Sequence, residues 1–308
     1  MTDATSKPAP LVLEGDSHGT WWHVELDRST LIPGQLVDGR LRIRADDPVE
    51  ARGLVVALTG VEHWRHRVTH TDAEGHPSTT VVTSTGDPVH EPVLLGGPIS
   101  LASGETLERS FQLPVPPLGP ASLDAEDAGF EWTLEAKLDV AGDLDRRLEA
   151  AVVVAQPMAL LRAGAIQLGE FALYERADIA GDGITGTIEL RPMPLVCGEP
   201  FSGRVELHVP GRLRLQEVRA EIRVHVEATV SEGEKQDVPA WIGALSPAAE
   251  VGGDLAYDVA GALPSTPLPS SELPHGRAGA TFHVILAVAW APDTHLVRDV
   301  AIASTSEV

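Results

Sequence analysis

The sequence contains little cysteine, few aromatic residues and no long apolar run. Cys197 is the only cysteine among 308 residues, so no intrachain disulfide can form, which is typical of proteins from a reducing compartment. Phe, Trp and Tyr together make up 4% of the chain. No run of about 18 apolar residues occurs, so no transmembrane helix is predicted. We therefore expect a soluble protein of the cytoplasm.

Positive charge is also scarce. The chain has 23 Lys and Arg against 45 Asp and Glu, which gives a net charge of −22. Proteins that bind nucleic acids or anionic membranes need basic surfaces to neutralise phosphates. We therefore expect no nucleic-acid binding and no direct insertion into a membrane. An acidic surface of this kind favours solubility.

The sequence motifs of catalytic sites are missing as well. The chain has no nucleophile elbow, no P-loop, no dinucleotide-binding fingerprint and no calcium-binding loop of alternating oxygen ligands. The neighbouring carboxylates Asp46 with Asp47, and Glu126 with Asp127, fall in turn-like segments. Cys197 is interpreted as a small apolar residue at the start of a strand. The sequence thus predicts no catalytic residue and no cofactor, and a chain that is not an enzyme.

Glycine and proline, by contrast, are abundant, with 29 and 24 residues. They divide the chain into short segments in which Val, Thr and Leu dominate, a pattern typical of β-strands and not of long helices. The first ten residues lack the apolar core of a signal peptide. We therefore predict a flexible leader over residues 1–10.

An internal repeat organises the rest of the chain. Residues 31–43 align without a gap with residues 195–207, and in both copies a turn glycine is followed five residues later by a second glycine that opens an alternating strand. The offset from Gly34 to Gly198 is 198 − 34 = 164. Glycine suits a backbone that turns sharply or bulges between strands.

A second block repeats at a shorter offset of 282 − 132 = 150, aligning Trp132 with Phe282 and residues 143–155 with 293–305. The first copy therefore has about 14 additional residues between the two blocks (164 − 150 = 14). They lie within residues 61–95, where the second copy has only the short polar segment 231–236. We interpret them as a longer hairpin with a mobile tip.

The repeat predicts an all-β fold: two tandem antiparallel β-sandwich domains, of immunoglobulin-like or arrestin-like type, related by internal duplication. We expect the N-terminal sandwich over residues 11–157 and the C-terminal sandwich over residues 158–308. Phe171, Leu173 and Tyr174 are predicted to form the first strand of the second sandwich.

Two proline-rich segments, residues 113–120 and 263–271, occupy equivalent places in the two copies. Proline cannot donate a hydrogen bond to a central strand ladder. Both segments are therefore predicted to be loops that cross between sheets.

The order of these motifs resembles that of the arrestin-like family, and of its bacterial sporulation-control branch in particular. The resemblance is carried by a Pro-Gly strand start at residues 32–39, a Gly-x-x-x-Trp strand end at 58–64, the Phe-Gln-Leu-Pro segment 111–114, and the strand 132–138. It covers residues 24–305, and the two copies resemble the amino-terminal and carboxy-terminal arrestin domains.

That resemblance implies a non-catalytic adaptor, scaffold or regulatory protein that binds other proteins on sheet faces or loops. The chain lacks the Pro-Pro-x-Tyr motifs with which α-arrestins recruit ubiquitin ligases. The charged cluster with which visual arrestins sense phosphate has no match that we can place, so phosphoreceptor binding is not implied.

The alternative function is a carbohydrate- or small-ligand-binding β-sandwich module. It would expose Trp21, Trp64 or Trp241 on one face as an aromatic platform. In the pair Trp21 and Trp22 we expect one ring in the core and one at the surface, because consecutive side chains of a strand alternate.

Four histidines, at positions 63, 66, 70 and 76, are close together in the sequence. On a strand His66 and His70 share one face while His63 points to the other. Two ligands can therefore converge, whereas a structural zinc site takes four. We predict no metal site and interpret these histidines as solvent-facing, with His66 and His70 as the candidates for any metal.

The most basic stretch of the chain is residues 62–67. It is either a small anion-binding edge or a set of charges that protects an exposed strand from pairing with another chain. Our candidates for contact with a protein partner are His63, Trp64, Arg65 and Arg67.

Overall fold

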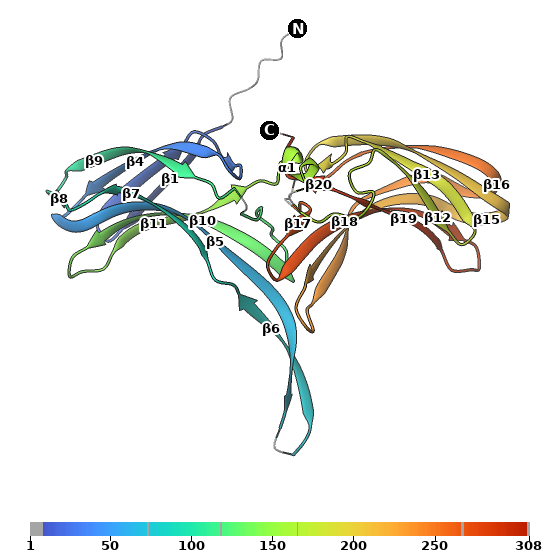
Figure 1. Ribbon diagram of the computed structural model, residues 1–308, viewed down its shortest axis with the longest axis horizontal. Coiled ribbons are helices and arrows are strands. Elements are labelled where there is room, and N and C mark those ends of the chain that lie inside the picture. Colours follow the sequence, from blue (N-terminus) through green and yellow to red (C-terminus); the bar gives the residue numbers. More distant parts are fainter. Residues whose placement is uncertain (1–8, 73, 118, 165, 266–267, 307–308) are drawn as a thin grey trace, which may run out of the picture. The chain divides into compact units, whose positions relative to one another are not determined.

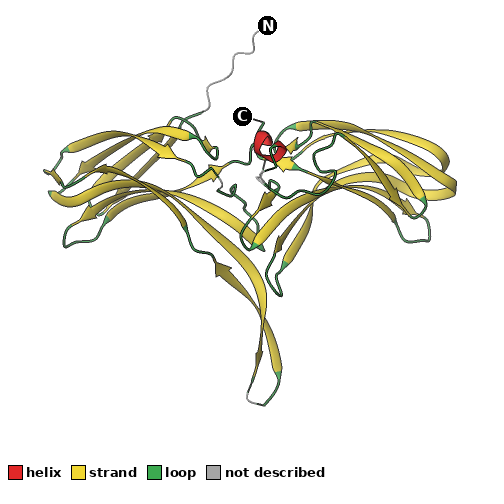
Figure 2. Ribbon diagram, viewed as in Figure 1, coloured by secondary structure: helices red, strands yellow, loops and turns green. Residues whose placement is uncertain are grey.

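In the computed structural model, strands make up 69% of the chain and helix 2%. The structure describes residues 9–72, 74–117, 119–164, 166–265 and 268–306; most of the expected leader lies outside these residues. The strands, yellow in Figure 2, form several antiparallel sheets. The prediction of a mostly-β chain is confirmed.

The described residues divide into two compact units. Unit 1 comprises the chain up to Glu62, Thr85–Ser122 and Phe130–Ala155, and unit 2 comprises His63–Ser84, Leu123–Gly129 and the chain from Gln156 onward. The outer part of the hairpin predicted within residues 61–95 thus belongs to unit 2, although its first strand begins in unit 1.

One sheet of unit 1 is antiparallel and has the strand order β1-β2-β4-β9. Its strands are β1 (Leu11–Ser17), β2 (Thr20–Leu26), β4 (Leu36–Ala45) and β9 (Thr106–Pro114). Alternation along β2 buries Trp22 completely and leaves Trp21 partly exposed, 5.8 Å from the Arg44 guanidinium. The predicted division of the tryptophan pair between core and surface is confirmed.

The other sheet begins in unit 1 with the order β3-β11-β10-β5, and β5 also pairs with β6, β7 and β8. The strands are β3 (Thr30–Leu31), β5 (Val49–Thr71), β6 (Pro77–Thr85), β7 (Val89–Gly96), β8 (Ile99–Leu101), β10 (Ala128–Val140) and β11 (Arg146–Val154). The long β5–β6 hairpin (Figure 1) is the hairpin predicted within residues 61–95. Trp132 of β10 is buried, and its Nε1–H donates to the Pro120 carbonyl at 2.8 Å, which attaches the proline-rich loop to the sheet.

The main sheet of unit 2 has the order β12-β13-β15-β18-β17, with β16 paired to β15 and β19 paired to β18. The strands are β12 (Arg176–Gly181), β13 (Ile184–Arg191), β15 (Pro200–Ala228), β16 (Lys235–Ala262), β17 (Ser271–Glu272), β18 (Gly276–Val288) and β19 (Thr294–Val300). The first part of β15 pairs with β13 and its second part with β18, while β16 follows both parts. The register of β15 with β16 shifts between Val209 and Leu213, at the point where β15 changes partner.

A short helix and a pair of short parallel strands complete unit 2. β14 (Leu195–Val196) pairs in parallel with β20 (Ile302–Ala303). The helix α1 (Met158–Arg162) buries Leu161 in a cluster with Val196 and Ala301. In the described part of the chain, no helix is long and apolar enough to cross a membrane.

The prediction that Phe171, Leu173 and Tyr174 lie in the first strand of the second copy is wrong. They lie in a turn, closed by a hydrogen bond of 3.1 Å from the Tyr174 N–H to the Phe171 carbonyl, and the first strand is β12. The Arg298 guanidinium donates to the carbonyls of Phe171 and Tyr174, which stabilises the turn where a strand was predicted.

Candidate functional site

The four candidate residues for partner contact lie at the base of the β5–β6 hairpin, in the part of β5 that belongs to unit 2. One edge of β5 is paired here. The Arg65 N–H donates to the Asp127 carbonyl at 2.9 Å, and the Arg65 carbonyl accepts from the Glu234 N–H at 3.0 Å. The Arg67 N–H donates to the Glu232 carbonyl at 2.8 Å. The strand edge is therefore occupied within unit 2, and the interpretation of the basic stretch as protection for an exposed edge is wrong here.

The two arginines at the hairpin base are ion-paired with acidic side chains of unit 2. Arg65 contacts Glu126 and places its Nη1 3.3 Å from Asp127 Oδ1. Arg67 donates from Nε to Glu234, and this hydrogen bond raises the pKa of Arg67. Since each guanidinium already has an acidic partner, the structure gives no support to the anion-binding interpretation of this stretch.

Asp127 is an enclosed acidic group beside the hairpin base, with 9% of the residue exposed. Burial raises the pKa of its carboxyl group, Arg65 lowers that pKa, and the nearby carboxylates of Glu126 and Glu234 raise it further. The net shift is upward. Ionising the Asp127 carboxyl group therefore costs free energy in the folded protein, and the nearby Arg65 offsets only part of that cost.

His63 and Trp64 also contact residues of unit 2. The Trp64 ring stacks on His275 with centroids 4.0 Å apart and an interplanar angle of 16°. His63 Nε2 lies 3.0 Å from the Ala125 carbonyl, so this nitrogen carries the proton and donates. A side chain at Gly129 would overlap the His63 ring. All four candidates therefore make contacts inside the chain.

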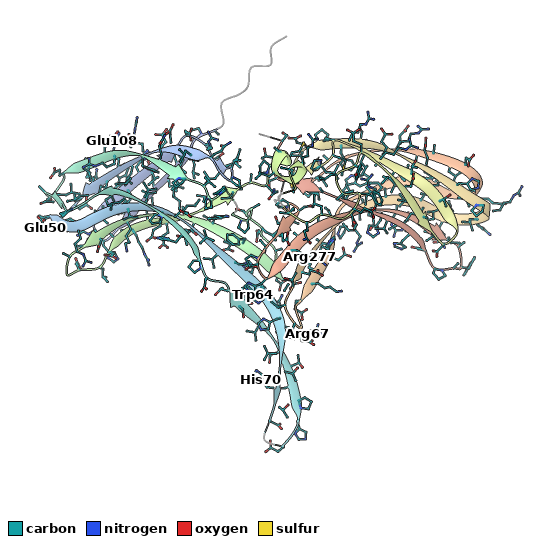
Figure 3. All side chains as sticks on the ribbon, viewed as in Figure 1. Glu50, Trp64, Arg67, His70, Glu108 and Arg277 are labelled. Carbon is teal, nitrogen blue, oxygen red and sulfur yellow. The ribbon has the colours of Figure 1, made fainter. Side chains whose placement is uncertain are left out.

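The two histidines considered for metal binding differ in their surroundings. His66 is partly buried, and its Nδ1 is buried without a hydrogen-bond partner among the described residues. His70 is exposed and lies further along β5 toward the hairpin tip (Figure 3). In the part of the chain that the structure describes, no group of three or more His, Cys, Asp or Glu side chains could hold a metal ion.

The three tryptophans of the alternative function are distributed over both units. Trp21 belongs to β2 of unit 1, whereas Trp64 stacks on His275 in unit 2. Trp241 lies on β16 and packs edge-on against Phe201 at a centroid distance of 5.1 Å. Each ring has its own packing partner.

Unit 2 contains a cavity of about 490 Å³ where β17 and β18 meet the segment 167–172. Its lining includes the side chains of His225, Ser271, Glu272 and Asp299. Sequence reasoning missed these residues, because they come from separate strands and follow no motif spacing. The only signal in the sequence is a polar cluster at residues 270–272 beside a proline-rich segment.

Arg298 stabilises the turn from Phe171 to Tyr174, at the end of the 167–172 segment. Only 4% of this residue is exposed, and burial lowers the pKa of its guanidinium. The guanidinium donates to the carbonyls of Phe171 and Ile188, both at 3.0 Å, and to the carbonyl of Tyr174. A charged donor is thus shared among backbone acceptors of two different segments.

Cys197 is partly buried, and burial raises the pKa of its thiol. Its backbone N–H donates to the Ala303 carbonyl at 3.0 Å, directly after β14. A raised pKa reduces the fraction of reactive thiolate, which is what the interpretation of Cys197 as a structural residue requires.

No protein-family model matches the chain, and no curated protein matches it.

Proposed function

We propose that the chain is an arrestin-like adaptor, built from two tandem antiparallel β-sandwich domains related by duplication, that works by binding other proteins and not by catalysis. The observation that carries this proposal is a repeated strand register. Trp22 pairs with Ile43 between β2 and β4, and Gly186 pairs with Leu207 between β13 and β15. Both members of the second pair follow the first by 164 residues, the offset of the sequence repeat (186 − 22 and 207 − 43).

The neighbouring hairpin repeats the same register. Gly15 pairs with Trp22 between β1 and β2, and Ile179 pairs with Gly186 between β12 and β13, again 164 residues further on. A slip of one residue would turn every side chain to the opposite face. Identical registers in two pairs of strands therefore support a common origin of the two units.

The turn glycines add a third correspondence. Gly34 and Gly198 have φ values of +82° and +74°, a conformation that glycine adopts without steric cost. The Gly34 N–H donates to the Val115 carbonyl at 3.0 Å, and the Gly198 N–H donates to the Pro264 carbonyl at 3.1 Å. In both copies the turn is thus attached to the start of the proline-rich loop.

The correspondence is weaker in the last hairpin. Trp132 pairs with Val152, but Phe282 pairs with Arg298 and not with Ile302, which the uniform offset of 150 would require. The two copies therefore diverge where β18 and β19 meet the turn held by Arg298.

The adaptor proposal is tested by capturing partners of the intact chain from native cells after chemical crosslinking, followed by mass spectrometry. We expect at least one protein to be enriched reproducibly over an unrelated bait of equal negative charge, because a −22 chain attracts basic proteins non-specifically. Repeated captures that yield no such protein would contradict the adaptor function.

The hairpin is the first place to look for the binding surface. Val81 and Val82 on β6 are 41% and 38% exposed, and the residues at the hairpin base are already engaged. If the partner binds the outer hairpin, replacing both valines by threonine should reduce capture. Val12→Thr on β1, where the valine is 49% exposed, is the matched control and should leave capture unchanged.

A second candidate function, small-ligand binding, is favoured by the cavity in unit 2 and not by the tryptophans. The carbohydrate form of this hypothesis requires Trp64 to be free for stacking on a sugar, and Trp64 is stacked on His275. A glycan array probed with the wild type and with Trp64→Ala separates the two functions. Glycan binding that disappears in the variant would favour the ligand-binding module over the adaptor.

A further inference from the structure

The second strand of the long hairpin (Figure 1) is an exposed edge strand without charge. β6 ends the sheet order β3-β11-β10-β5-β6, so one of its edges pairs with β5 and the other pairs with no strand in the described part of the chain. Its nine residues are exposed, apart from the partly buried Ser84. Every other described strand of more than three residues contains at least one Asp, Glu, Arg or Lys.

Edge strands elsewhere in the chain are protected against pairing. Charge, proline or a bulge usually prevents an exposed edge from pairing with another chain. Glu14 lies in β1, Glu108 in β9 and Asp178 in β12, and Pro239 interrupts β16. The one proline of β6, Pro77, is its first residue. The edge of β6 thus lacks the protection that the other edges have.

The outer hairpin also lacks a packed face. Side chains on both faces of β6 are exposed, and the β5 residues from Arg67 to Thr71 are exposed or only partly buried. A two-stranded hairpin without a packed face is marginally stable in water, whereas three or more strands stabilise each other. Additional strands at the β6 edge would supply the pairing that this hairpin lacks.

The pairing with β5 fixes which backbone groups of β6 are available. The Gly86 N–H donates to the Glu62 carbonyl at 2.9 Å, and the Asp72 N–H donates to the His76 carbonyl at 3.1 Å. Both bonds fit one unbroken register, since 62 + 86 and 72 + 76 both equal 148. The bonded residues on the β6 side have even numbers.

Odd-numbered residues of β6 therefore face the free edge with their backbone groups, because these groups alternate between the two edges of an antiparallel strand. They include Thr79, Val81 and Thr83. Pro77 has no N–H and would end any ladder formed there.

We propose that the free edge of β6 pairs with β6 of a second copy of this chain, antiparallel and about a two-fold axis at Val81. In this register Val81 lies opposite the second copy's Val81, and Thr79 lies opposite Thr83. These are the residues whose N–H and C=O groups face the edge, so each opposite pair can exchange two hydrogen bonds. Two hairpins then form one four-stranded sheet.

The composition of β6 favours a second copy as the occupant. Residues 78–84, Ser-Thr-Thr-Val-Val-Thr-Ser, are the same in both directions except at positions 80 and 82. A two-fold pairing therefore places serine opposite serine and threonine opposite threonine, and pairs of this kind are favourable. Two chains of net charge −22 repel each other, and an uncharged strand adds no like-charge pair to that repulsion. A basic peptide, which this net charge attracts, would find no acidic side chain on β6.

Sedimentation velocity of the full chain tests for the dimer. A two-fold pairing closes on itself, so we expect a dimer and no larger assembly. The contact is small, so we expect a reversible dimer that appears within a range of about 1 µM to 1 mM. Added salt should leave the dimer equally strong or strengthen it, because salt screens the repulsion between the copies. The dimer requires only the β6 edge and does not depend on the adaptor function.

Two matched cysteine variants test the register. Val81 and Val82 are 41% and 38% exposed. The two copies of residue 81 have Cα atoms about 5.5 Å apart in the proposed register, within the range of a disulfide. The two copies of residue 82 lie diagonally, about 7–8 Å apart, which is too far. Under mild oxidation by oxidised glutathione, Val81→Cys should form at least about fivefold more disulfide-linked dimer than Val82→Cys. The wild type, with its partly buried Cys197, gives the background.

A proline variant tests whether the backbone makes the contact. Val81→Pro removes an N–H that faces the free edge and leaves the bonds to β5 intact, so the dimer should weaken at least about tenfold. Val81→Thr keeps the N–H and should change the dissociation constant by no more than about threefold.

Each outcome supports or overturns self-pairing through β6. A dimer with the expected responses to Val81→Pro and to the two cysteine variants supports it. A chain that stays monomeric, equal crosslinking of both cysteine variants, or a dimer that salt dissociates overturns it. If the chain is monomeric but Val81→Pro reduces partner capture, the edge binds a strand of another protein, so self-pairing fails while the adaptor function stands. If the dimer forms and capture yields no partner, the adaptor function fails and self-pairing stands.

Discussion

Replacing Arg298 by methionine should destabilise unit 2 by about 2 kcal/mol. The side chain is 4% exposed and donates to the carbonyls of Ile188, Phe171 and Tyr174. The Phe171 carbonyl keeps a second hydrogen bond from the Tyr174 N–H, and Ile188 pairs with Ala177 in the β12–β13 ladder, so the loss falls mainly on the Tyr174 carbonyl. Each unpaired buried acceptor costs about 1–3 kcal/mol. Removal of a buried charge, whose pKa is lowered by burial, offsets part of this cost.

Two measurements test this value. Urea unfolding gives the loss of stability, and amide hydrogen exchange shows whether protection is lost first at residues 171–175, which the guanidinium holds. Arg298→Lys keeps the charge but not the planar fork of donors, and we expect it to lose about half as much. Arg277→Met is the control, because its exposed pair with Glu227 contributes at most about 1 kcal/mol.

If the free energy of unfolding of Arg298→Met is within about 1 kcal/mol of the wild-type value, or if the 171–175 amides keep their protection, the guanidinium does not stabilise the turn. A loss of similar size in Arg277→Met would show that the effect reflects positive charge in general. Either result would refute the reasoning.

Three further predictions concern other parts of the chain. The pKa of Asp127 is raised in the folded state, so its ionisation lowers stability as the pH rises above the ordinary carboxyl pKa. The free energy of unfolding of Asp127→Asn, measured in urea and compared with that of the wild type, should therefore be more favourable near pH 6 than near pH 3. A difference between variant and wild type that does not depend on pH would contradict this. Gly39→Ala places a Cβ into the Phe111 ring and should lower the free energy of unfolding by about 1–3 kcal/mol. Much of this stability should be recovered when Phe111→Ala is added to the same chain. If the losses of the two single variants simply add in the double variant, the overlap does not exist. Cys197, with its raised pKa, should react with iodoacetamide more slowly than free cysteine at neutral pH, and an equal rate would show that the thiol is accessible and ionised.

The turn glycines, the buried Trp22 and the long hairpin could be predicted from the sequence because their signals are local. Gly34 and Gly198 were predicted to turn the chain, and both have positive φ. The alternation that placed Trp22 in the core depends only on neighbours along one strand. The additional residues within 61–95, between the two repeated sequence blocks, likewise predicted the β5–β6 hairpin.

The surroundings of that hairpin could not be predicted in the same way. Arg65 and Arg67 were candidates for contact with a protein partner, and their partners inside the chain come from residues 126–127 and 232–234. A charge pattern shows that a strand can form ion pairs but does not name the partner, because the partner is far away in the sequence. The same holds for Trp64, whose stacking partner is His275.

The sequence by itself determined the β-rich character of the chain, the turn glycines and the long hairpin. Each of these follows from the order of apolar, polar and turn residues along short stretches. Only the tertiary structure decided that the outer hairpin belongs to unit 2, that Arg298 keeps Phe171 and Tyr174 in a turn, and that Ser271 and Asp299 line one cavity. These features depend on contacts between distant segments, and no local pattern of residues specifies which distant segments meet.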